Sequence, residues 1–89
     1  MRNKTWKNKI SETTQIPKDV SVGLPIIRIL GQEEIYVENY RGILEYTDTC
    51  IRIQTRHGQI LVSGKRMEIS YYTNDEMKIE GHFTQIHFC

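Results

Sequence analysis

The stretch that decides the fold runs from residue 50 to residue 72 and reads CIRIQTRHGQILVSGKRMEISYY. Apolar and polar side chains alternate along it, which is typical of strands with one buried face and one solvated face. The same alternation resumes at Met77, after the turn predicted at residues 73–76. The apolar positions of one parity are Ile51, Ile53, Ile60, Val62, Met67, Ile69, Tyr71, Met77 and Ile79. We expect these side chains to line one face of a sheet, and the polar positions between them to face water.

The composition supports a β protein. The chain has 89 residues, of which 38% are hydrophobic and 26% charged, and this fits one small globular domain. It contains 13 Ile, 4 Val and 8 Thr but only 4 Leu and no Ala. Branched side chains of this kind suit a pleated surface and lose rotamer freedom in helices. No apolar run approaches the roughly 18 residues that a membrane span needs.

Turn signals recur about every 8 to 12 residues from residue 26 onward, as in an antiparallel meander. The expected strands are Ile26–Leu30, Glu34–Glu38, Ile43–Thr47, Cys50–Arg56, Gln59–Ser63, Met67–Tyr72 and Met77–Phe88. We therefore predict an all-β fold, either an antiparallel β-sandwich or a partly open barrel of about seven short strands, because the apolar face needs a second layer to cover it. A five-stranded Sm-like barrel behind an N-terminal helix is the structural alternative.

Four of the predicted turns contain glycine, and two of these lie within the stretch that decides the fold. His57 and Gly58 are predicted to form a two-residue hairpin turn in which Gly58 supplies a positive φ. The segment Gly64-Lys65-Arg66 is predicted to separate two strands. Gly64 and Gly81 occupy matching places in a faint 17-residue repeat, where each is expected to allow a turn or bulge.

The beginning of the chain differs from the rest. Residues 1–24 are predicted to form a basic arm and connector ahead of a β-domain at residues 25–89. Residues 1–20 carry five Lys or Arg against two acidic residues, a net charge of +3. Trp6 and Ile10 share a helical face, and Pro17 ends any helix, so the arm is either a short helix or disordered. No apolar signal core follows Met1, and two cysteines make no disulfide framework, so we expect a cytoplasmic protein with reduced thiols.

The chain has none of the usual enzyme signatures, so we expect no enzyme, no cofactor and no metal. His82, His87 and Cys89 lie within eight residues, but their spacing matches no standard zinc site, and solvent-exposed histidines are expected. Cys50 and His57 lie at opposite ends of one predicted strand, about 20 Å apart, which excludes them as a nucleophile and base.

A nucleic-acid surface is the alternative function. Its candidate residues are Arg52, Arg56, Lys65, Arg66, Tyr71 and Tyr72. Basic and aromatic side chains together can bind single-stranded RNA. However, Glu45, Glu68 and Glu80 are expected to interleave with them, and a net charge of +1 argues against a protein built mainly to bind nucleic acid. A mixed, solvated face is therefore favoured.

The sequence of residues 37–46 predicts a well-specified hairpin. Its role is either structural or that of an exposed recognition edge. Its candidate residues are Glu38, Asn39, Arg41, Gly42, Glu45 and Tyr46. Asn39 suits a turn, Gly42 is expected to supply a positive φ, and Arg41 is expected to meet a carboxylate from Glu38 or Glu45. We favour the structural role over an exposed recognition edge.

Several stretches together resemble the YabP/YqfC family of small sporulation proteins, and its YqfC branch in particular. They are Ile16-Pro17-Lys18-Asp19-Val20, Leu24-Pro25-Ile26-Ile27-Arg28-Ile29 with Gly31, Glu38-Asn39-x-Arg41-Gly42-Ile43-x-Glu45-Tyr46, Gly58, Gly64 and Ile79-Glu80-Gly81. The resemblance covers roughly residues 16–88. It implies an all-β, non-enzymatic protein that is made in the mother cell of endospore-forming bacteria, and it assigns no catalytic or binding residue.

A protein with strand edges and no catalytic site is expected to bind other proteins. The partner would be a membrane-anchored sporulation protein at the forespore surface or a second copy of the chain. Ile26–Leu30 and Thr84–Phe88 are the most apolar candidates for edges that a partner covers.

Overall fold

The computed structural model of the protein describes residues 23–89, so the predicted helix or disordered arm lies outside the described residues. This part of the chain forms six strands and no helix. The strands are β1 (Ile26–Leu30), β2 (Glu34–Glu38), β3 (Tyr40–Tyr46), β4 (Cys50–Thr55), β5 (Gly58–Tyr72) and β6 (Glu76–Phe88). They make one antiparallel sheet in the order β1-β2-β6-β5-β4-β3. The predicted all-β antiparallel fold is confirmed.

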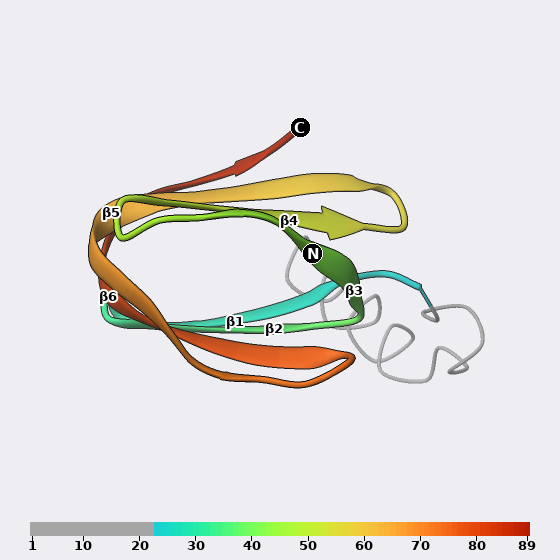
Figure 1. The fold of residues 1–89 in the computed structure, drawn as a ribbon, viewed down its shortest axis with the longest axis horizontal. Coiled ribbons are helices and arrows are strands. Elements are labelled where there is room, and N and C mark those ends of the chain that lie inside the picture. The colour runs from blue at the N-terminus through green and yellow to red at the C-terminus, as the bar shows by residue number, and fades with distance from the viewer. Residues whose placement is uncertain (1–22) are drawn as a thin grey trace, which may run out of the picture.

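The single sheet folds over on itself because β5 and β6 are long and both bend (Figure 1). The upper layer contains β3, β4, the first half of β5 and the second half of β6. The lower layer contains β1, β2, the first half of β6 and the second half of β5. The two bent strands join the layers at one end of a partly open sandwich.

Two glycines make the bend possible. A Cβ on Gly81 would lie 2.8 Å from the Cα of Met67, and a Cβ on Gly64 would lie 3.0 Å from the Cα of Phe83. The two strands therefore cross so closely that no side chain fits at either position. The ladder shifts register between Ser63 and Gly64, which confirms the bulge expected there.

The strand count is six, not seven, and the predicted turn Gly64-Lys65-Arg66 is wrong. Gln59–Ser63 and Met67–Tyr72 belong to one continuous strand, β5. Arg66 has φ 50°, and a second register shift lies between Lys65 and Glu68, so the chain bends through bulges instead of turning back. Because β6 bends beside it, β5 keeps a pairing partner through the bend.

The tight hairpin is displaced by one residue from the prediction. Arg56 and His57 form the turn between β4 and β5, and Gly58 is the first residue of β5, paired with Thr55. The Thr55 hydroxyl accepts a hydrogen bond from the amide of His57 (3.1 Å) and donates one to the carbonyl of Gly58 (2.9 Å). Thr55 thus fixes the turn immediately after itself. Gly58 has φ 143°, the glycine conformation that was expected.

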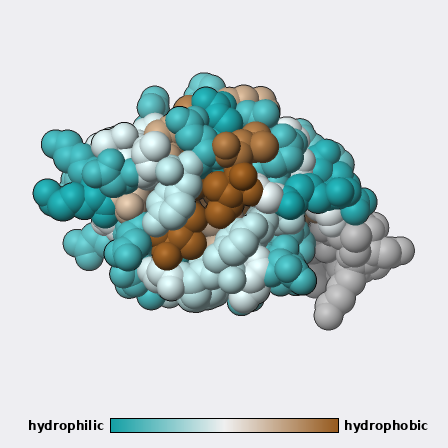
Figure 2. Space-filling model, in the orientation of Figure 1, coloured by the Kyte–Doolittle hydropathy of each residue, from teal (hydrophilic) through white to brown (hydrophobic). Residues whose placement is uncertain are grey.

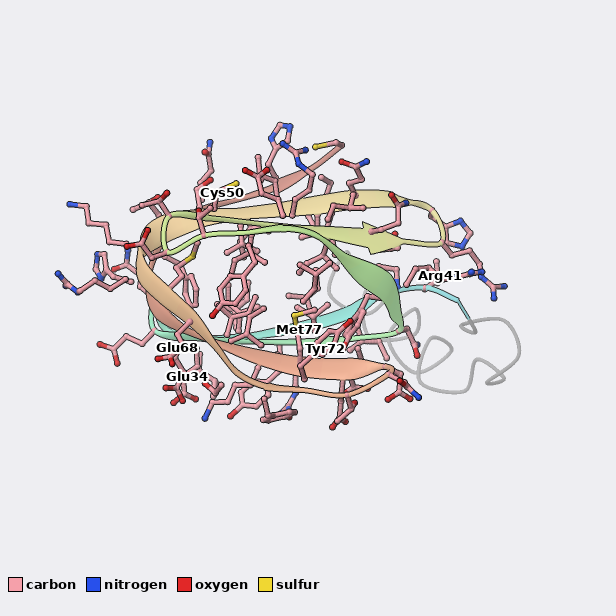
Figure 3. All side chains as sticks on the ribbon, in the orientation of Figure 1. Glu34, Arg41, Cys50, Glu68, Tyr72 and Met77 are labelled. Carbon is pink, nitrogen blue, oxygen red and sulfur yellow. The ribbon has the colours of Figure 1, made fainter. Side chains whose placement is uncertain are left out.

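Most of the core consists of four rows of side chains that run across the inner faces of the layers, and Tyr40, Met67 and Phe83 complete it. In the lower layer the rows are Ile29–Ile35–Ile79–Ile69 and Ile27–Val37–Met77–Tyr72. In the upper layer they are Phe88–Ile60–Ile53–Ile43 and Ile86–Val62–Ile51–Tyr46. The middle two members of every row are fully buried. Figure 3 shows Met77 pointing between the layers, whereas Glu34 and Glu68 point away from them.

The predicted inner parity holds for every residue except Tyr71. The ladder shifts between Ile69 and Tyr71, so Tyr71 pairs with Lys78 on the outer face and Tyr72 pairs with Met77 on the inner face. The Tyr72 ring stacks on Tyr40, with 5.7 Å between ring centroids and 17° between planes. A bulge reverses the side-chain alternation beyond it, and this is why the prediction for Tyr71 is wrong.

Candidate functional site

The sandwich has two open sides, and the outer members of the four rows lie there. We call the side between β3 and the second half of β5 the tyrosine side, formed by Ile43, Tyr46, Ile69 and Tyr72. We call the side between β1 and the second half of β6 the edge groove, formed by Ile27, Ile29, Ile86 and Phe88. The gap between the layers faces the viewer in Figure 2, and hydrophobic surface gathers in a band across it.

Tyrosine hydroxyls form hydrogen bonds across the tyrosine side. The Tyr46 hydroxyl accepts a hydrogen bond from the amide of Ile69 across the gap (2.9 Å). At the end of the same side, the Tyr40 hydroxyl donates to the carbonyls of Thr73 and Glu76. Because Tyr40 is buried, desolvation raises its pKa to about 12. Aromatic rings and satisfied hydroxyls therefore join the two layers here.

Within residues 23–89, hydrogen bonds join the edge groove only at its inner end, next to Gly81. The turn between β1 and β2 reaches β6, where Gln32 accepts a hydrogen bond from the amide of Phe83 (2.8 Å) and its side chain donates to the carbonyl of Phe83 (3.1 Å). Gly81 also donates to the carbonyl of Glu33 (3.2 Å). Away from this contact, β1 lies in the lower layer and the second half of β6 lies in the upper layer (Figure 1).

Uncharged side chains line the groove. A cavity of about 250 Å³ at its inner end is lined by Ile29, Gly31, Gln32, Ile35, Phe83, Thr84, Gln85 and Ile86. Ile29 is 51% exposed although Ile35, opposite it, is 1% exposed. Phe88 is 66% exposed although its neighbour Ile60 is 2% exposed. Inner-face residues this apolar and this uncovered are typical of a binding site.

Two strand edges flank the groove. β1 pairs with β2 on one side, and residues 84–88 of β6 pair with β5 on one side; within residues 23–89 no strand pairs with the other side of either. The sequence-based prediction that Ile26–Leu30 and Thr84–Phe88 are strand edges is confirmed. The groove between them was missed, because β1 is apolar on both faces except at Arg28 and its alternation cannot be read from sequence.

A cluster of charged residues lies on the outer face of the lower layer. Lys78 lies 3.0 Å from Glu80 and 3.9 Å from Glu34, two carboxylates that are directly opposite each other in the β2–β6 ladder. Hydrogen bonding to Lys78 lowers the pKa of Glu80, and the same contact raises the pKa of Lys78. Arg28 and Lys78 both lie over the ring of Tyr36, with Arg28 4.4 Å from its centroid.

The predicted hairpin at residues 38–46, for which a structural role was favoured over recognition, is a corner instead. β2 and β3 do not pair, because three strands lie between them in the sheet and β3 lies at one end of it. Asn39 forms the corner with φ 64°. Its backbone amide donates a hydrogen bond to the carbonyl of Asp75 (2.8 Å), and its side-chain amide donates one to the carbonyl of Leu24 (3.1 Å). The chain thereby leaves Glu38 in the lower layer and enters the upper layer, where β3 pairs with β4.

Two further expectations for this segment are wrong. Gly42 does not have a positive φ, and the residue with the left-handed conformation at the corner is Asn39. Glu45 forms its ion pair with Arg52 (3.6 Å) and not with Arg41. Arg41 lines a depression of about 210 Å³ together with Gly23, Asn39, Tyr40, Arg56 and Asp75.

The other candidate residues are not brought together. Cys50 begins β4, and His57 lies in the turn after it. Arg52 and Arg56 belong to the upper layer, whereas Tyr71 and Tyr72 belong to the lower layer. In residues 23–89 no three His, Cys, Asp or Glu side chains are grouped as metal ligands, and no helix there has the length and apolarity for crossing a membrane.

Comparison with known proteins identifies the family of this chain. The model of the YabP family matches residues 25–89. The chain is also 35% identical over 80 residues to the uncharacterized protein YqfC of Bacillus subtilis (strain 168), an alignment that covers 90% of this chain and 83% of YqfC. No solved structure matches it. The resemblance inferred from the sequence is thus confirmed, and the chain belongs to the YabP family.

Proposed function

We propose that this YabP-family protein is a non-enzymatic sporulation protein of endospore-forming bacteria that acts by binding another protein through the edge groove. Membership of the family supports the role in sporulation. The binding role rests on one observation. Ile29 and Phe88 are exposed on the inner faces of the two layers, although the residues paired with them are buried. A fold that leaves such side chains uncovered gains stability when a partner buries them.

In this proposal the protein acts in the cytoplasm of the mother cell and contributes to spore assembly. It lies at the forespore membrane when its partner is anchored there. A fluorescent fusion in a sporulating host tests the compartment. Signal confined to the mother cell after the septum forms supports the proposal. Signal in the forespore, or expression only during vegetative growth, contradicts it.

The groove is tested with a matched pair of substitutions at opposite ends of the sheet. Ile29→Lys places a charge inside the groove, whereas Leu44→Lys places the same charge on β3, where Leu44 is 52% exposed. Both positions are exposed enough for the purified variants to fold. We expect Ile29→Lys to reduce heat-resistant spores to the level of a deletion strain and Leu44→Lys to sporulate normally. A deletion without effect on sporulation refutes the proposed role, and normal sporulation with Ile29→Lys refutes the groove as its site.

A further inference from the structure

The two terminal strands of the sheet differ in their ability to accept another strand. β1 pairs with β2 over all five of its residues without a register shift. β3, at the other end of the sheet, has register shifts between Tyr40 and Gly42 and between Ile43 and Glu45. Bulges disfavour the addition of a strand, whereas a regular edge is a template for it. β1 is therefore the terminal edge suited to pairing.

A strand added to β1 would cover apolar surface on both faces of the sheet. Ile29 faces the groove, while Ile26 and Leu30 alternate with it on the outer face, and all three are about half exposed. In an added strand, successive side chains also point to opposite faces. Its inward side chains would lie between Ile29 on β1 and Ile86 on β6, in the cavity that both line.

Arg28 is the only charged residue of β1, and its charge favours one kind of added strand. Arg28 is exposed, and within residues 23–89 it has no ion pair, because Lys78 is the residue that contacts Glu34 and Glu80. Antiparallel pairing of β1 with a second copy over its full length would set Arg28 opposite Arg28 of that copy. Like charges directly opposite are destabilising, and opposite charges are stabilising. An acidic residue in the added strand fits this position.

We propose that β1 binds one extended segment of a different protein, which adds antiparallel to its free edge, with apolar side chains in the edge groove and an acidic side chain opposite Arg28. The inference rests on the proposed function and specifies its partner. Affinity comes from main-chain hydrogen bonds and apolar burial, and selectivity comes from the charge.

The test uses two synthetic peptides of alternating valine and threonine that differ only at one central residue, glutamate or lysine. Each is titrated into the isotope-labelled full-length protein, and amide chemical shifts are followed by NMR. We expect shifts centred on Ile27 and Ile29 and an affinity about three- to tenfold higher for the glutamate peptide. Arg28→Glu should reverse this preference. Arg41→Glu, which changes the net charge equally on β3, should leave it unchanged.

Several outcomes overturn the inference. These are shifts centred on β3, no shifts with either peptide, or a peptide preference that Arg28→Glu does not alter. A stable dimer by light scattering, with β1 amides protected from exchange, would assign the edge to a second copy. The sporulation result is independent: if Ile29→Lys abolishes spores while neither peptide binds, the groove functions but strand addition is wrong.

Discussion

Ile29 and Ile35 lie directly opposite each other in the β1–β2 ladder, yet Ile35 is 1% exposed and Ile29 is 51% exposed. The same difference between neighbours occurs at Phe88 and Ile60 in the other layer. Each row of the core thus ends in an apolar residue or a tyrosine at an open side. On the tyrosine side Tyr46 and Tyr40 form hydrogen bonds across the gap, whereas the hydrogen bonds that residues 23–89 form across the edge groove lie only near Gln32.

The first prediction compares the two isoleucines. Ile35→Ala removes fully buried atoms and should lower the free energy of unfolding by about 2–5 kcal/mol. Ile29→Ala removes atoms that are already half in water and should cost under about 1 kcal/mol. Urea unfolding of both variants measures the difference. Equal losses would mean that the groove is filled in the free protein.

The second prediction concerns two glycines. Gly81→Ala forces a Cβ to within 2.8 Å of the Cα of Met67 and should cost about 1–3 kcal/mol. Gly42→Ala meets no atom within 4 Å and should change stability by no more than about 0.5 kcal/mol. Thermal unfolding followed by circular dichroism gives the ranking. A lower melting temperature for Gly42→Ala than for Gly81→Ala would contradict the crossing of β5 and β6 at the bend.

The third prediction concerns alkaline pH. Folding raises the pKa of Tyr40 from 10.0 to about 12, chiefly by desolvation, so the folded protein holds this proton more tightly than the unfolded chain. The stabilisation is complete below the unfolded pKa and is lost as pH rises from about 10 toward about 12. Tyr40→Phe should remove this loss, although it should cost about 1–2 kcal/mol at neutral pH through its missing hydrogen bonds.

The measurement for Tyr40 is the free energy of unfolding as a function of pH. Tyr71→Phe serves as the control, because it removes a hydroxyl from the outer face and keeps Tyr40. This control should lose stability over the same alkaline range as the unmodified protein. An alkaline loss that persists in Tyr40→Phe would show that another group causes it.

The fourth prediction separates adjacent tyrosines. Tyr72 stacks on Tyr40, whereas Tyr71 lies on the outer face opposite Lys78. Tyr72→Ala should therefore cost about 0.5–1.5 kcal/mol more than Tyr71→Ala, the usual worth of an aromatic pair beyond its buried area. Denaturant unfolding of the two variants checks this. The reverse order would restore the simple alternation read from the sequence and exclude the bulge before Tyr71.

Side-chain alternation made much of the core predictable. Ile51, Ile53, Ile60 and Val62 could be assigned to one face because a strand places every second side chain on the same side. The candidate hairpin at residues 38–46 could not be placed in the same way. Its neighbours in sequence suggested that β2 pairs with β3, but β3 pairs with β4 after Asn39 turns the chain out of the lower layer.

The sequence by itself therefore determined the all-β class and the inward parity of most strands, since both follow from local composition and a period of two residues. Specific stretches of the sequence also carried the resemblance to the family. Only the tertiary structure decided that β5 is one bent strand, that Tyr72 and not Tyr71 faces inward, and that Ile29 and Phe88 flank a groove. Bulges, bends and open edges depend on which distant strand lies alongside. In the sequence, Gly64 and Gly81 only permit a bend. The close crossing of β5 and β6 in the structure is what requires glycine at these two positions.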